Sequence, residues 1–216
     1  KNITFIQGNA HELSFINEIL HQHQDWDVIV DFMSYSIEEF VERKQNLLSS
    51  CRQYICISSS RVYANCDLIN EESPRLIDII TDNDYLHSHD YSMNKALIEN
   101  ELLGKFSNYT IIRPYITYGE NRLQLGSLEK EDWLYRILNN HSLVISEDIL
   151  AKKTTLTYGF DVARAIYSLM GRPETLGQIY NITQSKSKTW QEILDLYISI
   201  IREETDIKPR VKLLKE

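Results

Sequence analysis

Residues 55–63 read ICISSSRVY, in which an apolar run passes directly into three hydroxyl side chains. An uninterrupted apolar run of this kind predicts a strand that is buried on both faces. In a doubly wound sheet, ligands bind beyond the carboxyl ends of the strands, so Ser58, Ser59 and Ser60 are candidate site residues. The alternative interpretation is that these serines only end the strand through local turn hydrogen bonds.

Short apolar runs alternate with longer helical patterns along the rest of the chain. We expect strands at residues 3–7, 28–32, 54–58, 109–113 and 178–182, with a weaker one at 143–146. Helices are expected at residues 13–21, 37–49, 91–103, 131–139, 160–170 and 190–203. Thr189 and Glu192 have the spacing of a capping box, and Gly104 stands where the helix from Tyr91 should end. The alternation predicts the α/β class, with a doubly wound, mostly parallel sheet.

The composition excludes several classes of function. Of the 216 residues, 43% are hydrophobic and 25% are charged, as in an ordinary globular protein. No stretch approaches the roughly 18 consecutive apolar residues that a membrane span needs, so we expect no membrane partner. The formal net charge is −8 and no run of Lys or Arg stands out, which argues against a nucleic-acid partner.

The cysteines and histidines do not predict a metal site. The three cysteines contain no C-x-x-C pair and are odd in number, so neither zinc nor a disulfide framework is indicated. The pairs His21-x-His23 and His87-x-His89 would point to opposite faces of a helix, and no clustered carboxylates accompany them. We therefore expect no metal ion and a reducing, cytoplasmic location.

Tyr91 and Lys95 stand four residues apart in the helix expected at residues 91–103. This spacing places both side chains on one helix face, one turn apart. A nearby ammonium stabilises a phenolate, so the phenol becomes a usable base near neutral pH. A Tyr and a Lys at this spacing are also common on solvated helix faces, so the motif alone leaves both interpretations open.

Six segments follow one another in a recognisable order. They are DWDVIVDF at residues 25–32, S-S-x-x-V-Y at 58–63, Y-x-x-x-K at 91–95, IIRPYITYG at 111–119, YGFDVARA at 158–165 and GQIYNI at 177–182. This order resembles the extended short-chain dehydrogenase/reductase family, also called the NAD-dependent epimerase/dehydratase family. The matches cover nearly the whole chain, which makes the order far more specific than any one motif.

The resemblance implies a role for each matching residue. Ser59 takes the position that bonds the substrate oxygen, Tyr91 that of the general acid or base, and Lys95 that of the residue holding the nicotinamide ribose. Further contacts with an NAD or NADP cofactor are implied for Asn9, Phe32, Ser34, Ser58, Pro114 and Tyr115. Substrate contacts are implied for Ser60, Ile116 and Arg122. Hydride transfer is the chemistry of the cofactor, so the protein orients the reactants and moves the proton.

Two parts of the family pattern are missing from the chain. The opening strand and its G-x-x-G-x-x-G turn, which binds the pyrophosphate, have no counterpart in QGNA at residues 7–10. The chain also opens without Met, so we expect further residues upstream of Lys1 and poor cofactor binding by these residues alone. Where the family's dehydratases carry T-D-E, this chain has Ser59-Ser60-Arg61, which disfavours dehydration.

We expect residues 1–120 to form a partial Rossmann-like cofactor domain that lacks its first strands, and residues 121–216 a mixed α/β substrate lobe. The predicted function is an NAD(P)-dependent epimerase or reductase that acts on a hydroxyl or ketone of a small sugar-like or nucleotide-linked substrate. The alternative is a non-catalytic regulatory or scaffold member of the same fold. The resemblance also implies a homodimer that pairs through the helices at residues 37–49 and 91–103.

Overall fold

The structure, a computed structural model, describes residues 3–23, 25–66, 68–86, 88 and 90–215. The chain forms two compact units. Unit 1 comprises Lys1–Pro114 and Ala165–Ile182, and unit 2 comprises Tyr115–Arg164 and Thr183–Glu216. Each unit has a hydrophobic core of its own.

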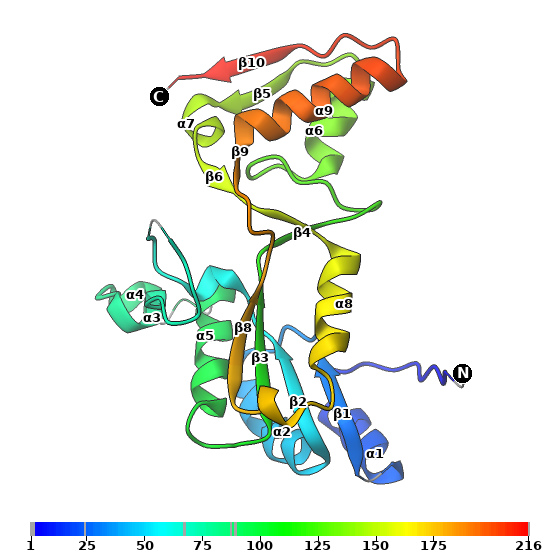
Figure 1. Cartoon of the computed structure of the whole chain (residues 1–216), viewed down its shortest axis with the longest axis vertical. Coiled ribbons are helices and arrows are strands. Elements are labelled where there is room, and N and C mark those ends of the chain that lie inside the picture. Colours follow the sequence, from blue (N-terminus) through cyan, green and yellow to red (C-terminus); the bar gives the residue numbers. More distant parts are fainter. Residues whose placement is uncertain (1–2, 24, 67, 87, 89, 216) are drawn as a thin grey trace. The chain divides into compact units, whose positions relative to one another are not determined.

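Unit 1 is built on a four-stranded parallel sheet (Figure 1). Its strands are β1 (Trp26–Asp31), β2 (Cys51–Ile57), β3 (Tyr109–Pro114) and β8 (Gln178–Ile182), in the order β1-β2-β3-β8. The register places Asp31 opposite Cys56 and Ile57 opposite Ile112, so the carboxyl ends of β1, β2 and β3 reach the same edge. The predicted parallel sheet is thereby confirmed.

The strand predicted at residues 3–7 is wrong. This segment has no regular secondary structure, and its apolar side chains are exposed, Ile3 by 74% and Phe5 by 91%. A strand needs a neighbour to pair its backbone N–H and C=O groups. Among the described residues, β1 pairs only with β2, so the apolar segment has no strand beside it.

Helices cover both faces of the sheet in unit 1. Helices α1 (Leu13–Gln22), α2 (Ile37–Ser49) and α5 (Tyr91–Leu102) bury their apolar side chains in a core that includes Tyr54 of β2. The preceding residue of β2, Gln53, points to the opposite face, because side chains alternate along a strand. There its amide donates to the carbonyl of Leu169, the last residue of α8 (Gly159–Leu169). This two-sided covering confirms the predicted doubly wound α/β class.

Short elements complete unit 1. They are a 3₁₀ turn at Ser60–Val62, helices α3 (Leu76–Ile79) and α4 (Asn83–Leu86), and a second 3₁₀ turn at Pro173–Thr175. Gly104 follows α5 with a φ of 71°, which confirms the left-handed helix end expected there.

In its described part, unit 2 contains three pairs of strands, three whole helices and the first residues of α8. The parallel pairs are β4 (Ile116–Tyr118) with β7 (Leu156–Tyr158) and β5 (Leu143–Ser146) with β10 (Val211–Leu214), and the antiparallel pair is β6 (Lys153–Thr154) with β9 (Lys188–Thr189). The helices are α6 (Lys130–Leu138), α7 (Glu147–Leu150) and α9 (Trp190–Glu204). The capping box of Thr189 and Glu192 is confirmed at the start of α9.

Candidate active site

A polar stripe runs along one face of α5. Asp90 caps the helix by accepting a hydrogen bond of 2.8 Å from the Ser92 N–H, so Tyr91 is the first helical residue. Tyr91, Lys95 and Glu99 then follow at intervals of four residues, which places them on one face. Tyr91 is 41% exposed, whereas Lys95 is 4% and Glu99 0% exposed. The stripe therefore leads from solvent into the core.

Lys95 lies at the carboxyl edge of the sheet. Its Nζ donates to the carbonyl oxygens of Ile57, the last residue of β2, at 2.8 Å, and of Met33, just beyond β1, at 3.1 Å. The same Nζ is 5.7 Å from the centroid of the Tyr91 ring. Burial lowers the pKa of Lys95, although the nearby Cys56, Asp31 and Glu99 oppose that shift. The sheet thus anchors an ammonium beside the exposed phenol.

The three serines at the end of β2 have three different surroundings. Ser58 is buried, and its Oγ donates to the Glu99 carboxylate at 2.6 Å. Ser59 Oγ accepts a hydrogen bond of 3.2 Å from the Arg61 N–H, and Ser60 Oγ donates to the Arg113 carbonyl at 3.1 Å. Of these three side-chain bonds only that of Ser59 is a local turn bond, because Glu99 and Arg113 lie far along the chain from Ser58 and Ser60.

Glu99 is the centre of a buried charge network that the sequence did not single out. Its two carboxylate oxygens accept bonds of 2.8 and 2.6 Å from Arg113, and a third bond of 3.2 Å from Arg75. Arg113 Nη1 also donates to the Tyr63 hydroxyl at 2.7 Å. Burial alone would lower the pKa of Arg113, but its bonds with Glu99 outweigh burial and raise it. The sequence signal that could have found Glu99 is the continuation of the four-residue spacing by one more helical turn, as Y-x-x-x-K-x-x-x-E.

Asp31, the last residue of β1, is a second buried acid near Lys95 that the sequence did not single out. Its carboxylate accepts a bond of 2.6 Å from the Tyr54 hydroxyl and one of 2.9 Å from the Met33 N–H. Burial raises the pKa of Asp31 above its usual 3.8, although these hydrogen bonds and the charge of Lys95 oppose the shift.

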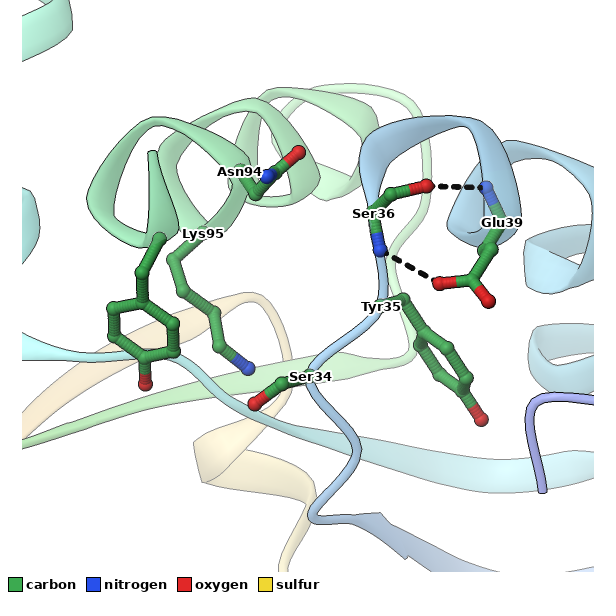
Figure 2. Close-up of a pocket in the computed structure, with 7 residues that line it drawn as sticks. Ser34, Tyr35, Ser36, Glu39, Asn94 and Lys95 are labelled. Carbon is green, nitrogen blue, oxygen red and sulfur yellow. Dashed lines mark hydrogen bonds between the residues drawn. The ribbon is translucent and has the colours of Figure 1, made fainter. Parts of the chain in front are cut away.

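A polar pocket of about 440 Å³ opens beside the stripe. It is lined by Ser34, Tyr35, Ser36, Glu39, Tyr91, Asn94 and Lys95. Figure 2 shows Lys95 extending from α5 towards the segment that carries Ser34. The Asn94 side chain accepts a bond of 3.1 Å from the Ile37 N–H, which ties α5 to the start of α2. The pocket thus brings together three of the predicted residues, Ser34, Tyr91 and Lys95.

The other residues predicted in unit 1 lie outside this pocket lining. Phe32 is 68% exposed just after β1, and Pro114 is the last residue of β3. Asn9 lies in the turn before α1, where its Oδ1 accepts a bond of 3.1 Å from the His11 N–H.

Three of the predicted residues belong to unit 2. Tyr115 is its partly exposed first residue, and Ile116 on β4 packs against its core. Arg122 lies 3.5 Å from Glu129 and lines a pocket with Tyr118. Two of the histidines considered as metal ligands, His87 and His89, lie outside the described residues.

The family is decided by a comparison of the sequence with family models. The model of the NAD dependent epimerase/dehydratase family matches residues 3–183. The chain belongs to this family. A search of curated proteins finds no match. The match to the family model confirms the resemblance inferred from the order of the motifs. It also confirms that the family to which the chain belongs uses a cofactor of the NAD type.

Solved structures share the fold at low sequence identity. Pal from Bacillus thuringiensis has a TM-score of 0.68 at 17% identity, over 98% of this chain and 69% of that one. The dTDP-glucose 4,6-dehydratase of Bacillus anthracis, in complex with NAD, has a TM-score of 0.70 at 18% identity, over 98% and 67%. The UDP-N-acetylglucosamine 4-epimerase of Methanobrevibacter ruminantium, in complex with UDP-N-acetylmuramic acid, has a TM-score of 0.63 at 21% identity, over 93% and 66%. At these identities the likeness shows the fold alone.

The length and hydropathy of the helices bear on whether the chain can cross a membrane. Within the described ranges, none combines the length and the hydropathy needed to cross a membrane.

Proposed function

We propose that Tyr91, Lys95 and Ser59 form the active site of an NAD(P)-dependent epimerase or reductase. The substrate is a sugar-like or nucleotide-linked small molecule, and the enzyme acts on one of its hydroxyl or ketone groups. The observation that supports this most directly is Lys95, a nearly buried ammonium that two carbonyls hold at the sheet edge, 5.7 Å from the ring of an exposed Tyr91. Families of this fold bind their ligands at that edge.

The pocket contains groups suited to the ribose half of a nicotinamide cofactor. Lys95, Tyr91 and Ser34 all line the pocket. Lys95 brings an ammonium, two of whose three N–H groups already bond the carbonyls of Ile57 and Met33, and Tyr91 and Ser34 each bring a hydroxyl. When bound, the cofactor supplies hydride transfer. The chain's own residues then orient the substrate oxygen through Ser59 and exchange its proton through Tyr91, with the Lys95 charge stabilising the phenolate.

One observation narrows the type of reaction, and a second narrows the class of substrate. Ser59-Ser60-Arg61 offers no acidic pair for elimination, so dehydration is disfavoured. The dehydratase and the epimerase with which the chain shares its fold are named for dTDP- and UDP-linked sugars. We therefore propose nucleotide-linked sugars as the first substrates to test.

The test is Tyr91→Phe, assayed for turnover of a panel of UDP- and dTDP-linked sugars with NAD and NADP. Loss of turnover with an unchanged circular dichroism spectrum supports the proposal, because only the phenolic oxygen is removed. Tyr135→Phe is the matched control, since Tyr135 is an exposed tyrosine of α6 in unit 2. Turnover by Tyr91→Phe equal to that of the wild type would refute the assignment.

A second candidate function is a non-catalytic regulatory or scaffold member of the family. The observation behind it concerns residues 1–103, in which Gly8 is the only glycine, so these residues do not contain the G-x-x-G-x-x-G turn that binds the pyrophosphate. Titration of the chain with NADH, followed by the fluorescence of the nucleotide, separates the two. Saturable binding that Lys95→Met abolishes supports the enzyme, and saturable binding that Lys95→Met leaves unchanged supports the non-catalytic member.

A further inference from the structure

Unit 2 contains an apolar cavity that the proposed chemistry in unit 1 does not use. Its volume is about 760 Å³, within the range of sites for small ligands. The walls come mainly from α6 and α9 and include Trp133, Leu134, Leu138, Ile193, Leu196 and Ile200. Leu138, Leu196 and Ile200 are each about half exposed, which is unusual for three large apolar side chains lining one cavity.

One wall of the cavity is rigid and aromatic. The rings of Trp133 and Tyr197 stack with centroids 4.6 Å apart and an interplanar angle of 8°. Trp133 is also fixed by its indole N–H, which donates to the Leu123 carbonyl at 2.9 Å. A wall held in this way keeps its shape without a ligand, so little ordering cost is expected when one binds.

The cavity also has a polar end. Thr154 of β6 lines it and is 4% exposed, yet its Oγ1 has no hydrogen-bond partner within the part of the chain that the structure describes. A buried hydroxyl without a partner is costly, which marks it as a group that a ligand can satisfy. Lys188 of β9 lines the cavity too and is the register partner of Thr154, so the two side chains lie on the same face of the strand pair.

We propose that this cavity binds a free medium-chain carboxylate. The carboxylate is held by the Lys188 ammonium and the Thr154 hydroxyl, and the alkyl chain lies between α6 and α9. An ammonium and a hydroxyl both donate to carboxylate oxygens, and a charge-assisted bond of this kind is stronger than a neutral one. Lys186 lies on the same lining and adds a second positive charge, so the lining has two lysines and one carboxylate, that of Glu204. All of the lining residues belong to unit 2, whereas Tyr91 and Lys95 belong to unit 1.

The test uses dodecanoate as the probe and the whole chain as the protein. Isothermal titration calorimetry is expected to show one saturable site in the micromolar range. Dodecanoate brominated on its chain is expected to quench tryptophan fluorescence, because Trp133 lines the cavity. Dodecan-1-ol, which has the same chain without the charge, is expected to bind at least about tenfold more weakly.

Four variants separate the contribution of the polar end to dodecanoate binding from that of the apolar walls. Lys188→Gln and Thr154→Val are each expected to weaken dodecanoate binding by about tenfold. The first removes the positive charge and the second removes the hydroxyl donor. Leu196→Glu places a carboxylate at an exposed position of the wall and is expected to abolish binding while α9 stays folded. Lys212→Gln, an exposed lysine of β10 outside the cavity, is the matched control and is expected to bind as the wild type does.

Three results would overturn the proposal. The first is no binding of dodecanoate by the wild type at millimolar concentration. The second is equal affinity for dodecan-1-ol and dodecanoate, or equal weakening by Lys188→Gln and Lys212→Gln. The third is a dimer in analytical ultracentrifugation that Leu196→Glu dissociates, because the apolar walls would then be covered by a second copy of the chain. If Thr154→Val fails to fold, Lys188→Gln and Leu196→Glu still decide the question.

Discussion

The two ends of the polar stripe on α5 lie on one helix face but have very different surroundings. At the inner end, Glu99 is fully buried and accepts bonds from Ser58, Arg75 and Arg113. At the outer end, Tyr91 is 41% exposed and borders a polar pocket. A buried charge is stable only when it is paired and hydrogen-bonded, whereas a group that meets a substrate must be reachable. The inner end therefore serves folding, and the outer end is placed for chemistry.

The largest expected effect is the loss of the inner end. Glu99→Ala leaves Arg113, which is 2% exposed, buried without its carboxylate partner. We expect the free energy of unfolding to fall by about 3–5 kcal/mol, as for other broken buried ion pairs. Urea denaturation followed by circular dichroism measures it.

The matched control for that change is Glu101→Ala on the same helix. Glu101 pairs with Lys44 and with Lys105 at a more accessible position, so its loss should cost less than about 1 kcal/mol. Equal losses for Glu99→Ala and Glu101→Ala would contradict the distinction between buried and accessible pairs.

Two neighbouring serines, Ser58 and Ser59, also differ in what they contribute to folding and to the proposed chemistry, and the expected effects on stability are smaller. Ser58→Ala removes a buried hydroxyl that donates to Glu99 at 2.6 Å and should cost about 1–3 kcal/mol. Ser59→Ala removes an acceptor for the Arg61 N–H and should cost about 0.5–1 kcal/mol, but it should abolish turnover under the proposed function. Thermal unfolding and turnover are measured on both variants. A larger loss of stability for Ser59→Ala than for Ser58→Ala would reverse the comparison.

A pH-dependent effect is expected from Asp31, the acid at the end of β1. Its pKa is raised in the folded state, mainly by burial, so the folded protein keeps the proton over a range in which the unfolded chain has released it. Stability must therefore fall as pH rises from about 3.8 through the raised folded pKa, and stay constant above it. Asp31→Asn removes this pH-dependent contribution.

The measurement for Asp31 is a difference between two proteins. Free energies of unfolding of the wild type and Asp31→Asn are compared at several pH values between 4 and 8. The wild type should lose stability relative to the variant as pH rises. A constant difference, or one of opposite sign, would show that burial does not govern this carboxyl.

The smallest expected effect on stability is at the outer end of the stripe. Tyr91→Phe removes one hydroxyl from a side chain that is 41% exposed, so the free energy of unfolding should change by less than about 0.5 kcal/mol. Differential scanning calorimetry measures it. A loss above 2 kcal/mol would mean that Tyr91 is a folding residue, like Glu99.

Much of the fold could be predicted because local patterns and tertiary packing agree. Each of the six predicted helices is confirmed within one residue at both ends, and the buried strands at β2 and β3 follow from continuous apolar runs. The strand expected at residues 143–146 is confirmed as β5, but the other short strands of unit 2 were not predicted. Two of them, β6 and β9, have two residues each, and two residues show no periodicity. The segment at residues 3–7 has a strand's composition but no strand to pair with.

The sequence by itself determined the α/β class, the helix bounds and the spacing that places Tyr91 and Lys95 on one face of α5. These are local properties, because helix periodicity and capping depend on residues a few positions apart. Only the tertiary structure decided that Lys95 is anchored by carbonyls at the ends of two strands, that Ser58 faces Glu99 and that Thr154 lies beside Lys188 in a cavity. Those contacts join residues far apart in the chain, and burial and charge pairing select them only after the sheet and its helices have packed.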